Sequence, residues 1–148
     1  MIQRDLAHRI EAASKRFPSV TLVGPRQSGK STLCRAVFHG YAYANLEAPD
    51  TRSFALQDPR AFLAQFPKGA VLDEIQRCPE LLSYLQERID EDPARGRWIL
   101  TGSQNLALMD SVSQSLAGRT VVLNLLPLAR GEVLRFRKHP KTLDETIL

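Results

Sequence analysis

The pattern of apolar and polar residues along this chain alternates between two periods, and the alternation predicts its elements. Short apolar or alternating runs, typical of strands, lie at residues 19–23, 41–46, 70–74, 98–101 and 120–126. Apolar residues recur at helical spacing over residues 2–15, 31–38, 58–66, 79–89 and 105–117. Strands that alternate with helices form βα units. The pattern therefore predicts an α/β fold, a three-layer αβα sandwich around a five-stranded parallel sheet.

Length and composition fit one ordinary globular domain. A chain of 148 residues can bury a single core. With 43% hydrophobic and 24% charged residues, the chain belongs to neither a disordered nor a fibrous class. Its N-terminal segment is charged where a signal peptide would be apolar, and no apolar run reaches membrane-spanning length. We therefore expect a cytoplasmic protein that does not enter membranes. Cys34 and Cys78 form no C-x-x-C pair, so both thiols are expected to be reduced.

A phosphate-binding pattern, G-x-x-x-x-G-K-[ST] (Walker A), occupies residues 24–31 between a predicted strand and a predicted helix. Glycines let backbone N–H groups turn toward phosphate oxygens, and the helix N-terminus adds partial positive charge. Lys30 is expected to reach the β and γ phosphates, and the Ser31 hydroxyl to bind Mg²⁺. The nucleotide-binding residues predicted here are Gly24, Pro25, Arg26, Gln27, Ser28, Gly29, Lys30, Ser31 and Thr32.

Two acids, Asp73 and Glu74, end the predicted strand at residues 70–74 (Walker B). In an open α/β sheet, ligands bind at the carboxyl ends of the strands, so both carboxylates are expected beside the phosphate loop. Asp73 is the second candidate partner of Mg²⁺, either as a direct ligand or in the outer coordination sphere of the ion, and Glu74 is the candidate base for an attacking water. A base for water favours hydrolysis over phosphoryl transfer to a bound acceptor.

Two later positions are candidate catalytic residues beside Glu74. Ser103 ends the strand expected next to the phosphate-loop strand, where its side chain could hold the attacking water or sense the γ-phosphate. Alternatively, Ser103 or Asn105 caps the helix that follows. Arg119 stands between that helix and the last strand, from which it could reach a neighbouring subunit as an arginine finger. A surface salt bridge is the equal alternative for this arginine.

Taken in order, these motifs resemble the AAA-type predicted P-loop ATPases of bacteria and archaea, which usually carry a nuclease-like C-terminal domain. The motifs that carry the resemblance are GPRQSGKS, NLE followed by PDTR and DPRAFL, VLDEIQRCPEL, ILTGSQN and SLAGRTVVLNLLPLARGE. The resemblance implies Mg-ATP binding, a hydrolytic Glu74, and sensor and finger roles at Ser103 and Arg119. It also implies an N-terminal helix at residues 1–16, an ATPase core at 17–128 and a C-terminal helical stub at 129–148. The chain thus looks like a truncated or separately encoded ATPase core, its lid domain missing or only a stub.

Three functions are compatible with these motifs. The favoured function is an ATPase that drives a conformational change in an unknown protein partner, with a homo-oligomer as a candidate assembly. A non-hydrolysing nucleotide-binding module and a small-molecule kinase are the alternatives. The net charge of +4 is compatible with nucleic acid but weak support for it. A basic cluster after the last strand, usually a solvated face but also able to contact phosphates, comprises Arg130, Arg135, Arg137, Lys138, His139 and Lys141.

Overall fold

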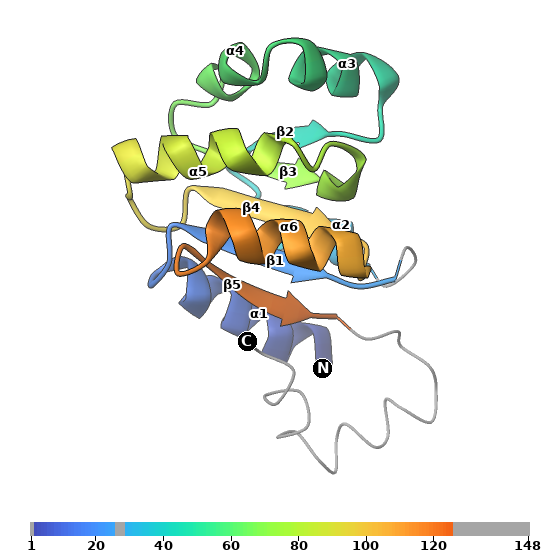
Figure 1. The fold of residues 1–148 in the computed structure, drawn as a ribbon. Helices are drawn as coiled ribbons and strands as arrows, with labels where there is room; N and C mark the ends of the chain where they lie inside the picture. The colour runs from blue at the N-terminus through green and yellow to red at the C-terminus, as the bar shows by residue number, and fades with distance from the viewer. Residues whose placement is uncertain (1, 26–28, 126–148) are drawn as a thin grey trace.

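The computed structural model of the chain describes residues 2–25 and 29–125, and it is built on one parallel sheet (Figure 1). The strands are β1 (Ser19–Val23), β2 (Ala42–Asn45), β3 (Ala70–Asp73), β4 (Trp98–Gly102) and β5 (Thr120–Asn124). They form a five-stranded sheet in the order β2-β3-β4-β1-β5, and each neighbouring pair is parallel. The predicted parallel sheet is confirmed.

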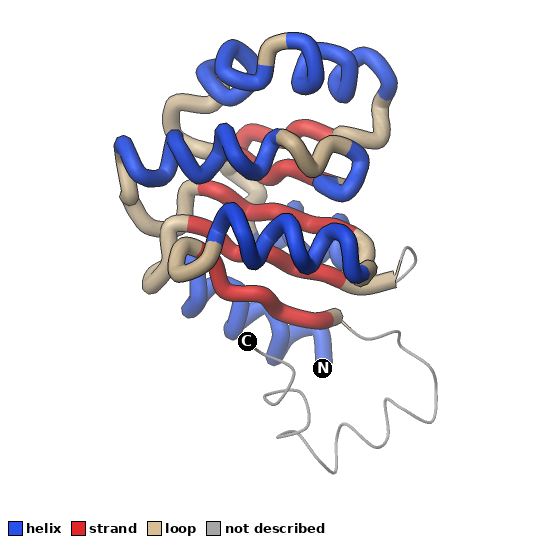
Figure 2. The backbone as a smooth tube through the Cα atoms, in the orientation of Figure 1, coloured by secondary structure: helices blue, strands red, loops and turns tan. Residues whose placement is uncertain are grey.

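Helices pack against both faces of this sheet and complete the three layers (Figure 2). One face carries α1 (Ile2–Ser14) and α2 (Lys30–Val37). The core on the other face is made with α3 (Pro49–Gln57), α4 (Pro59–Ala64), α5 (Leu81–Glu91) and α6 (Leu106–Leu116). Parallel strands require such crossover connections, and the helices supply them.

Alternation along the strands divides the apolar residues between two cores. Leu72 and Leu100 face α5 and α6, whereas Val71 and Ile99 face α1 and α2. All of these side chains are at most 2% exposed. Burying one such side chain contributes roughly 1.5–3 kcal/mol. Because both faces are covered, apolar residues predominate on both sides of the central strands, which makes these strands recognisable in the sequence.

Some element boundaries differ from the sequence prediction. Helix α3 was not predicted, since its Phe54 and Leu56 are exposed and only Ala55 is buried, which leaves no helical apolar pattern. The helix expected to begin at Pro79 begins at Leu81, because a 3₁₀ turn, η1 (Ile75–Arg77), and further i→i+3 hydrogen bonds precede it. The expected stub at residues 129–148 and its basic cluster lie outside the described residues.

The parallel arrangement brings several loops to one edge of the sheet. β1, β3 and β4 all end there, and the residues that follow them include Gly24, Glu74 and Ser103. This is the edge at which ligands bind in α/β sheets. Within residues 2–25 and 29–125, no helix has both the length and the apolar character needed to cross a membrane.

Candidate functional site

The phosphate loop joins the end of β1 to the start of α2, as its motif requires. Gly24 N–H donates to Gly102 O at 3.1 Å, so the first residue of the loop is hydrogen-bonded to the end of β4. Gly29 has φ 85°, a left-handed conformation that a glycine adopts without strain, and it caps α2. Thr32 lies exposed on the first turn of that helix. Arg26, Gln27 and Ser28 fall outside the described residues.

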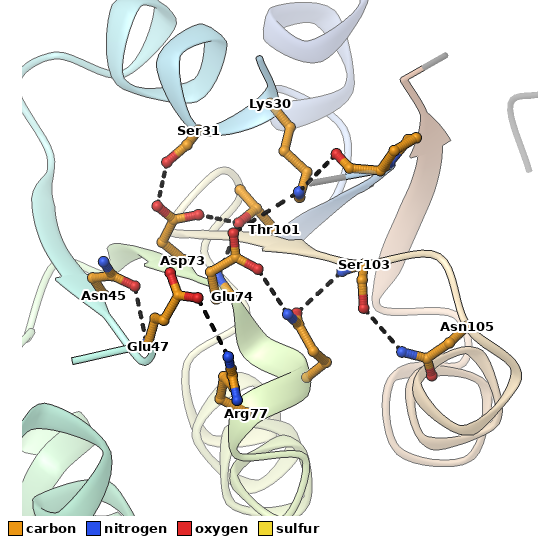
Figure 3. A network of polar contacts seen from close by, with 12 residues as sticks. Lys30, Ser31, Asn45, Glu47, Asp73, Glu74, Arg77, Thr101, Ser103 and Asn105 are labelled. Atoms are coloured by element: carbon orange, nitrogen blue, oxygen red, sulfur yellow. Dashed lines mark hydrogen bonds and ion pairs between the residues drawn. The ribbon is translucent and has the colours of Figure 1, made fainter. Parts of the chain in front are cut away.

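Lys30 is buried at the mouth of the loop, with 1% of its side chain exposed. Its ammonium donates to Pro25 O at 3.2 Å and lies 3.9 Å from Glu74 Oε2. A buried cation is tolerated when such partners surround it. The motif lysine and the acid that follows β3 therefore share one site, as predicted (Figure 3).

Asp73, 3% exposed, accepts hydrogen bonds from three hydroxyl groups. Ser31 donates to Oδ2 and Thr101 donates to Oδ1 (Figure 3). Tyr43 also donates to Oδ2, at 2.5 Å. Burial, and next the hydrogen bond to Asp73, raise the pKa of Tyr43 to about 12, so this phenol remains a donor at neutral pH. These contacts hold the carboxylate beside α2.

The donor atoms of Ser31 and Asp73 suit Mg²⁺. A hydroxyl and a carboxylate supply the hard oxygen ligands this ion prefers, and Mg²⁺ is commonly held by one or two protein groups together with substrate phosphates. The Ser31–Asp73 hydrogen bond places both ligands on the same spot at the end of β3. The residues present therefore fit the ion expected from the motif.

Glu74 departs from the strand in a left-handed conformation, with φ 60° and ψ 52°. Among the described residues other than glycine, no other residue has a positive φ. Such strain persists where surrounding contacts enforce it, and it occurs often at functional sites. Here Glu74 N–H donates to Thr101 Oγ1 at 3.1 Å, while the carboxylate accepts from Gln76 Nε2 at 2.7 Å. The turn directs this carboxylate toward Lys30.

The end of β4 connects the site to α6. Ser103 N–H donates to Gln76 Oε1 at 3.1 Å, and Ser103 Oγ accepts from Asn105 Nδ2 at 2.9 Å. Asn105 Oδ1 accepts from Leu108 N–H at 2.7 Å, which confirms the alternative that Asn105 caps this helix. The position of Ser103 beside the phosphate-loop strand is also confirmed by the β1–β4 pairing. Its sensor role stays a prediction.

Arg119 is not brought to these residues within one chain. It precedes β5 and therefore lies near the amino ends of the parallel strands, whereas Asp73 lies at the carboxyl end of β3. Its guanidinium forms a bidentate pair with Asp90, with N–O distances of 2.7 and 3.1 Å. The hydrogen bond to Asp90 raises the pKa of Arg119 and lowers that of the aspartate. The surface ion pair is thus present, and a finger role toward a second subunit stays a prediction.

Sequence reasoning missed three side chains of the site: Tyr43, Gln76 and Thr101. Each acts through a residue on a neighbouring strand or turn, so its role depends on strand order. Thr101 is the polar end of an otherwise apolar run, and Gln76 follows the acidic pair at a spacing of two residues. Those signals could have selected both. Tyr43 carries no comparable signal.

Neither cysteine contributes a reactive thiol here. Cys34 and Cys78 are both buried and free. Burial, and secondarily the charge of Asp73, raise the pKa of Cys34 to about 12. A thiol that stays protonated is inert as a nucleophile. The reading of both residues as packing thiols is consistent with these surroundings.

Two solved structures share this fold. The Walker-type ATPase PABY2304 of Pyrococcus abyssi matches with a TM-score of 0.59 and 17% identity, covering 95% of this chain and 57% of that one. The P-loop NTPase domain of the sigma-54 transport activator from E. coli matches with a TM-score of 0.56 and 20% identity, covering 85% and 95%. At these identities the likeness concerns the fold. Both structures support a P-loop NTPase architecture.

Two proteins and one family model are similar to this chain in sequence. The uncharacterized proteins Mb2031c of Mycobacterium bovis and Rv2008c of Mycobacterium tuberculosis are each 34% identical to this chain over 132 residues. The match covers 88% of the chain and 30% of the length of each relative. A family model described as an AAA domain matches residues 16–134, which include the phosphate loop and the acidic pair. The chain belongs to the AAA-type family of P-loop ATPases, whose fold binds nucleotides.

Proposed function

We propose that this chain binds ATP together with Mg²⁺ and hydrolyses it, and that hydrolysis drives a conformational change in a protein partner. One arrangement carries the proposal. The Ser31–Asp73 hydrogen bond lies beside the Lys30–Glu74 pair, whose charged atoms are 3.9 Å apart. A metal-ligand pair and a cation–base pair thus converge at the carboxyl end of β3.

Each side chain has a distinct role in this proposal. Lys30 neutralises charge on the β and γ phosphates, and backbone N–H groups at the start of α2 bind phosphate oxygens. Ser31 and Asp73 hold Mg²⁺, which when bound offsets charge on the transferred phosphoryl group. Glu74 accepts the proton of the attacking water. The side chain of Glu74 is 14% exposed, so water can reach a carboxylate that is otherwise enclosed.

The position of Glu74 favours hydrolysis over the two alternatives. A kinase needs an acceptor pocket at the γ-phosphate, whereas a carboxylate next to Lys30 is suited to orient water. A non-hydrolysing module has no need of a base held by Lys30, Gln76 and a strained backbone. The energetic cost of that left-handed residue is of order 1–3 kcal/mol. Retaining it is readily understood if Glu74 takes part in a reaction.

Phosphate release by the purified chain tests the proposal. We expect Mg²⁺-dependent release of phosphate from ATP, which stops when the metal is chelated. ATP binding without turnover would instead favour the non-hydrolysing module. Transfer of the γ-phosphate to an added nucleoside or carbohydrate would favour the kinase. Absence of ATP binding in the presence of Mg²⁺ would contradict all three.

A further inference from the structure

The carboxamide of Gln76 bridges the candidate base and the end of β4. Gln76 lies in the middle of the η1 turn, directly after β3. Its Nε2 donates to Glu74 Oε1 at 2.7 Å, and its Oε1 accepts from Ser103 N–H at 3.1 Å. Figure 3 shows Glu74 and Ser103 at the two ends of this part of the network. In the proposed function Gln76 is neither a metal ligand nor the base.

The chemistry of both partners fixes the orientation of this amide. A carboxylate can only accept, and a backbone N–H can only donate. The reversed amide would place its oxygen against Glu74 and its NH₂ group against Ser103 N–H, losing both hydrogen bonds. The observed orientation is therefore the one that satisfies all four groups. A donor to an ionised carboxylate also forms a stronger hydrogen bond than one between neutral groups.

The turn that carries Gln76 is itself held in place. Arg77 Nη2 lies 3.3 Å from Glu47 Oε2 on the loop after β2, and Ile75 is fully buried. Gly102 leaves the space that the amide occupies, since a Cβ there would lie 3.1 Å from Gln76 Oε1. The amide thus reaches Glu74 from a turn whose backbone is held by its neighbours. A glutamate side chain has many rotamers in the absence of a partner. Without the hydrogen bond from Gln76, the Glu74 carboxylate would therefore sample other positions.

We infer that Gln76 is a positioning residue that holds the Glu74 carboxylate beside Lys30 in the orientation needed to meet the attacking water. The inference rests on the proposed hydrolysis. A neutral amide suits this role because it donates a hydrogen bond without adding charge or competing for the proton. Its second hydrogen bond, to Ser103 N–H, anchors it to the strand beside the phosphate-loop strand. Gln76 acts through Glu74 and does not itself contact the phosphates.

Two substitutions separate positioning from a merely structural role. Gln76→Glu keeps an acceptor for Ser103 N–H but removes the donor to Glu74 and places a second carboxylate there. Gln76→Met keeps the length of the side chain and removes both hydrogen bonds. Gln65 is the matched control, because its amide donates to Phe62 O at 3.0 Å on α4, away from Glu74. Gln65→Glu and Gln65→Met are therefore made in parallel.

We expect both Gln76 variants to lower kcat by on the order of a hundredfold, the effect of misplacing a reacting group by about 1 Å. The Kd for a β,γ-imido analogue of ATP, measured with Mg²⁺, should stay within about threefold of the parent value, since phosphate contacts are retained. The Gln65 variants should keep the parent kcat. In a Glu74→Gln background, Gln76→Met should lower turnover no further, because the residue acts through Glu74.

The outcomes distinguish failure of the Gln76 inference from failure of the proposed ATP hydrolysis. If the parent hydrolyses ATP and both Gln76 variants do so at the parent rate, the inference is overturned and the proposed function stands. An equal loss from Gln76→Met with and without Glu74 would also overturn it. Loss of turnover in Gln76→Glu, with an unchanged melting temperature, supports positioning over folding. A parent chain that binds ATP without turnover overturns both the inference and the hydrolysis on which it rests.

Discussion

The hydroxyl of Thr101 donates a hydrogen bond to Asp73 Oδ1 and thereby ties the end of β4 to the end of β3. Thr101 Oγ1 also accepts a hydrogen bond from the backbone N–H of Glu74, at 3.1 Å. One fully buried hydroxyl thus serves both members of the acidic pair. The acidic pair and the phosphate-loop helix are in turn joined by Ser31.

Thr101→Val should weaken both stability and metal-dependent nucleotide binding. Valine has the shape of threonine but leaves Asp73 and the Glu74 N–H short of a partner, at a cost of about 1–3 kcal/mol. Urea denaturation measures the loss, and ATP binding over a range of Mg²⁺ concentrations measures the effect on the site. The matched control is Thr21→Val on β1, which removes a 2.8 Å hydroxyl contact with Thr120. Equal Mg²⁺ dependence in both variants would contradict the role given to Thr101.

Gly29→Ala should impair nucleotide binding through the backbone. At φ 85° an alanine is strained by roughly 1–2 kcal/mol, and the loop is expected to relax away from the phosphates. Gly40→Ala is the control, because a Cβ there meets nothing within 4 Å. Isothermal titration with Mg-ATP should show weaker binding for the first variant alone. Parent-like affinity in Gly29→Ala would mean that the left-handed residue does not shape the loop.

Tyr43 gives a prediction for alkaline pH. Burial and the hydrogen bond to Asp73 raise its pKa from 10.0 to about 12. A phenol whose pKa is higher in the folded than in the unfolded state stabilises the fold at low and neutral pH. That contribution is lost as pH rises from about 10 to about 12. Tyr43→Phe should therefore reduce the decline in unfolding free energy over this window, measured by denaturation at several pH values. An identical decline in parent and variant would contradict the assignment.

The predicted finger role of Arg119 concerns an assembly of subunits. Arg119→Ala should leave ATP affinity nearly intact and lower turnover on the order of a thousandfold, since a finger meets charge that develops in the transition state. Mixing this variant with Glu74→Gln protein should restore part of the activity. Arg60→Ala is the control, because Arg60 also forms an exposed bidentate pair, with Glu87 at 3.0 and 3.1 Å.

Two results would contradict that role. One is a monomer, established by light scattering at assay concentration, that hydrolyses ATP at the full rate. The other is a mixture no more active than its components. Exposed ion pairs contribute little to stability, so neither arginine variant should unfold the chain.

Most of the fold could be predicted from the sequence because the sheet is buried on both faces. β1, for example, carries β-branched and apolar residues between Pro18 and Gly24 and contains no charged residue. Helix α3 could not be predicted in this way. Its Phe54 and Leu56 are exposed and only Ala55 is buried, so the periodic signal that reveals a half-buried helix is missing. The 3₁₀ turn of η1 is likewise too short to carry a period.

The candidate site was predictable to the extent that its chemistry is local in sequence. Lys30 and Ser31 belong to one motif, and Asp73 and Glu74 end one strand. The partners Tyr43 and Thr101 come from strands β2 and β4 on either side of β3, so only the strand order reveals them. The register pairs Tyr43 with Val71, two residues before Asp73 and on the same face of the sheet. Arg119 illustrates the reverse case, a residue whose place in the order of elements leaves its partner undetermined.

The comparison of Glu74→Gln with the parent chain tests the central claim most directly. The substitution removes the base while keeping the size of the side chain, and Lys30, Ser31 and Asp73 remain in place. The account predicts that the variant binds Mg-ATP with an affinity close to that of the parent and that its phosphate release falls by on the order of a hundredfold to ten-thousandfold. Phosphate release at the parent rate by a variant that binds ATP normally would contradict the claim that this site hydrolyses ATP through Glu74.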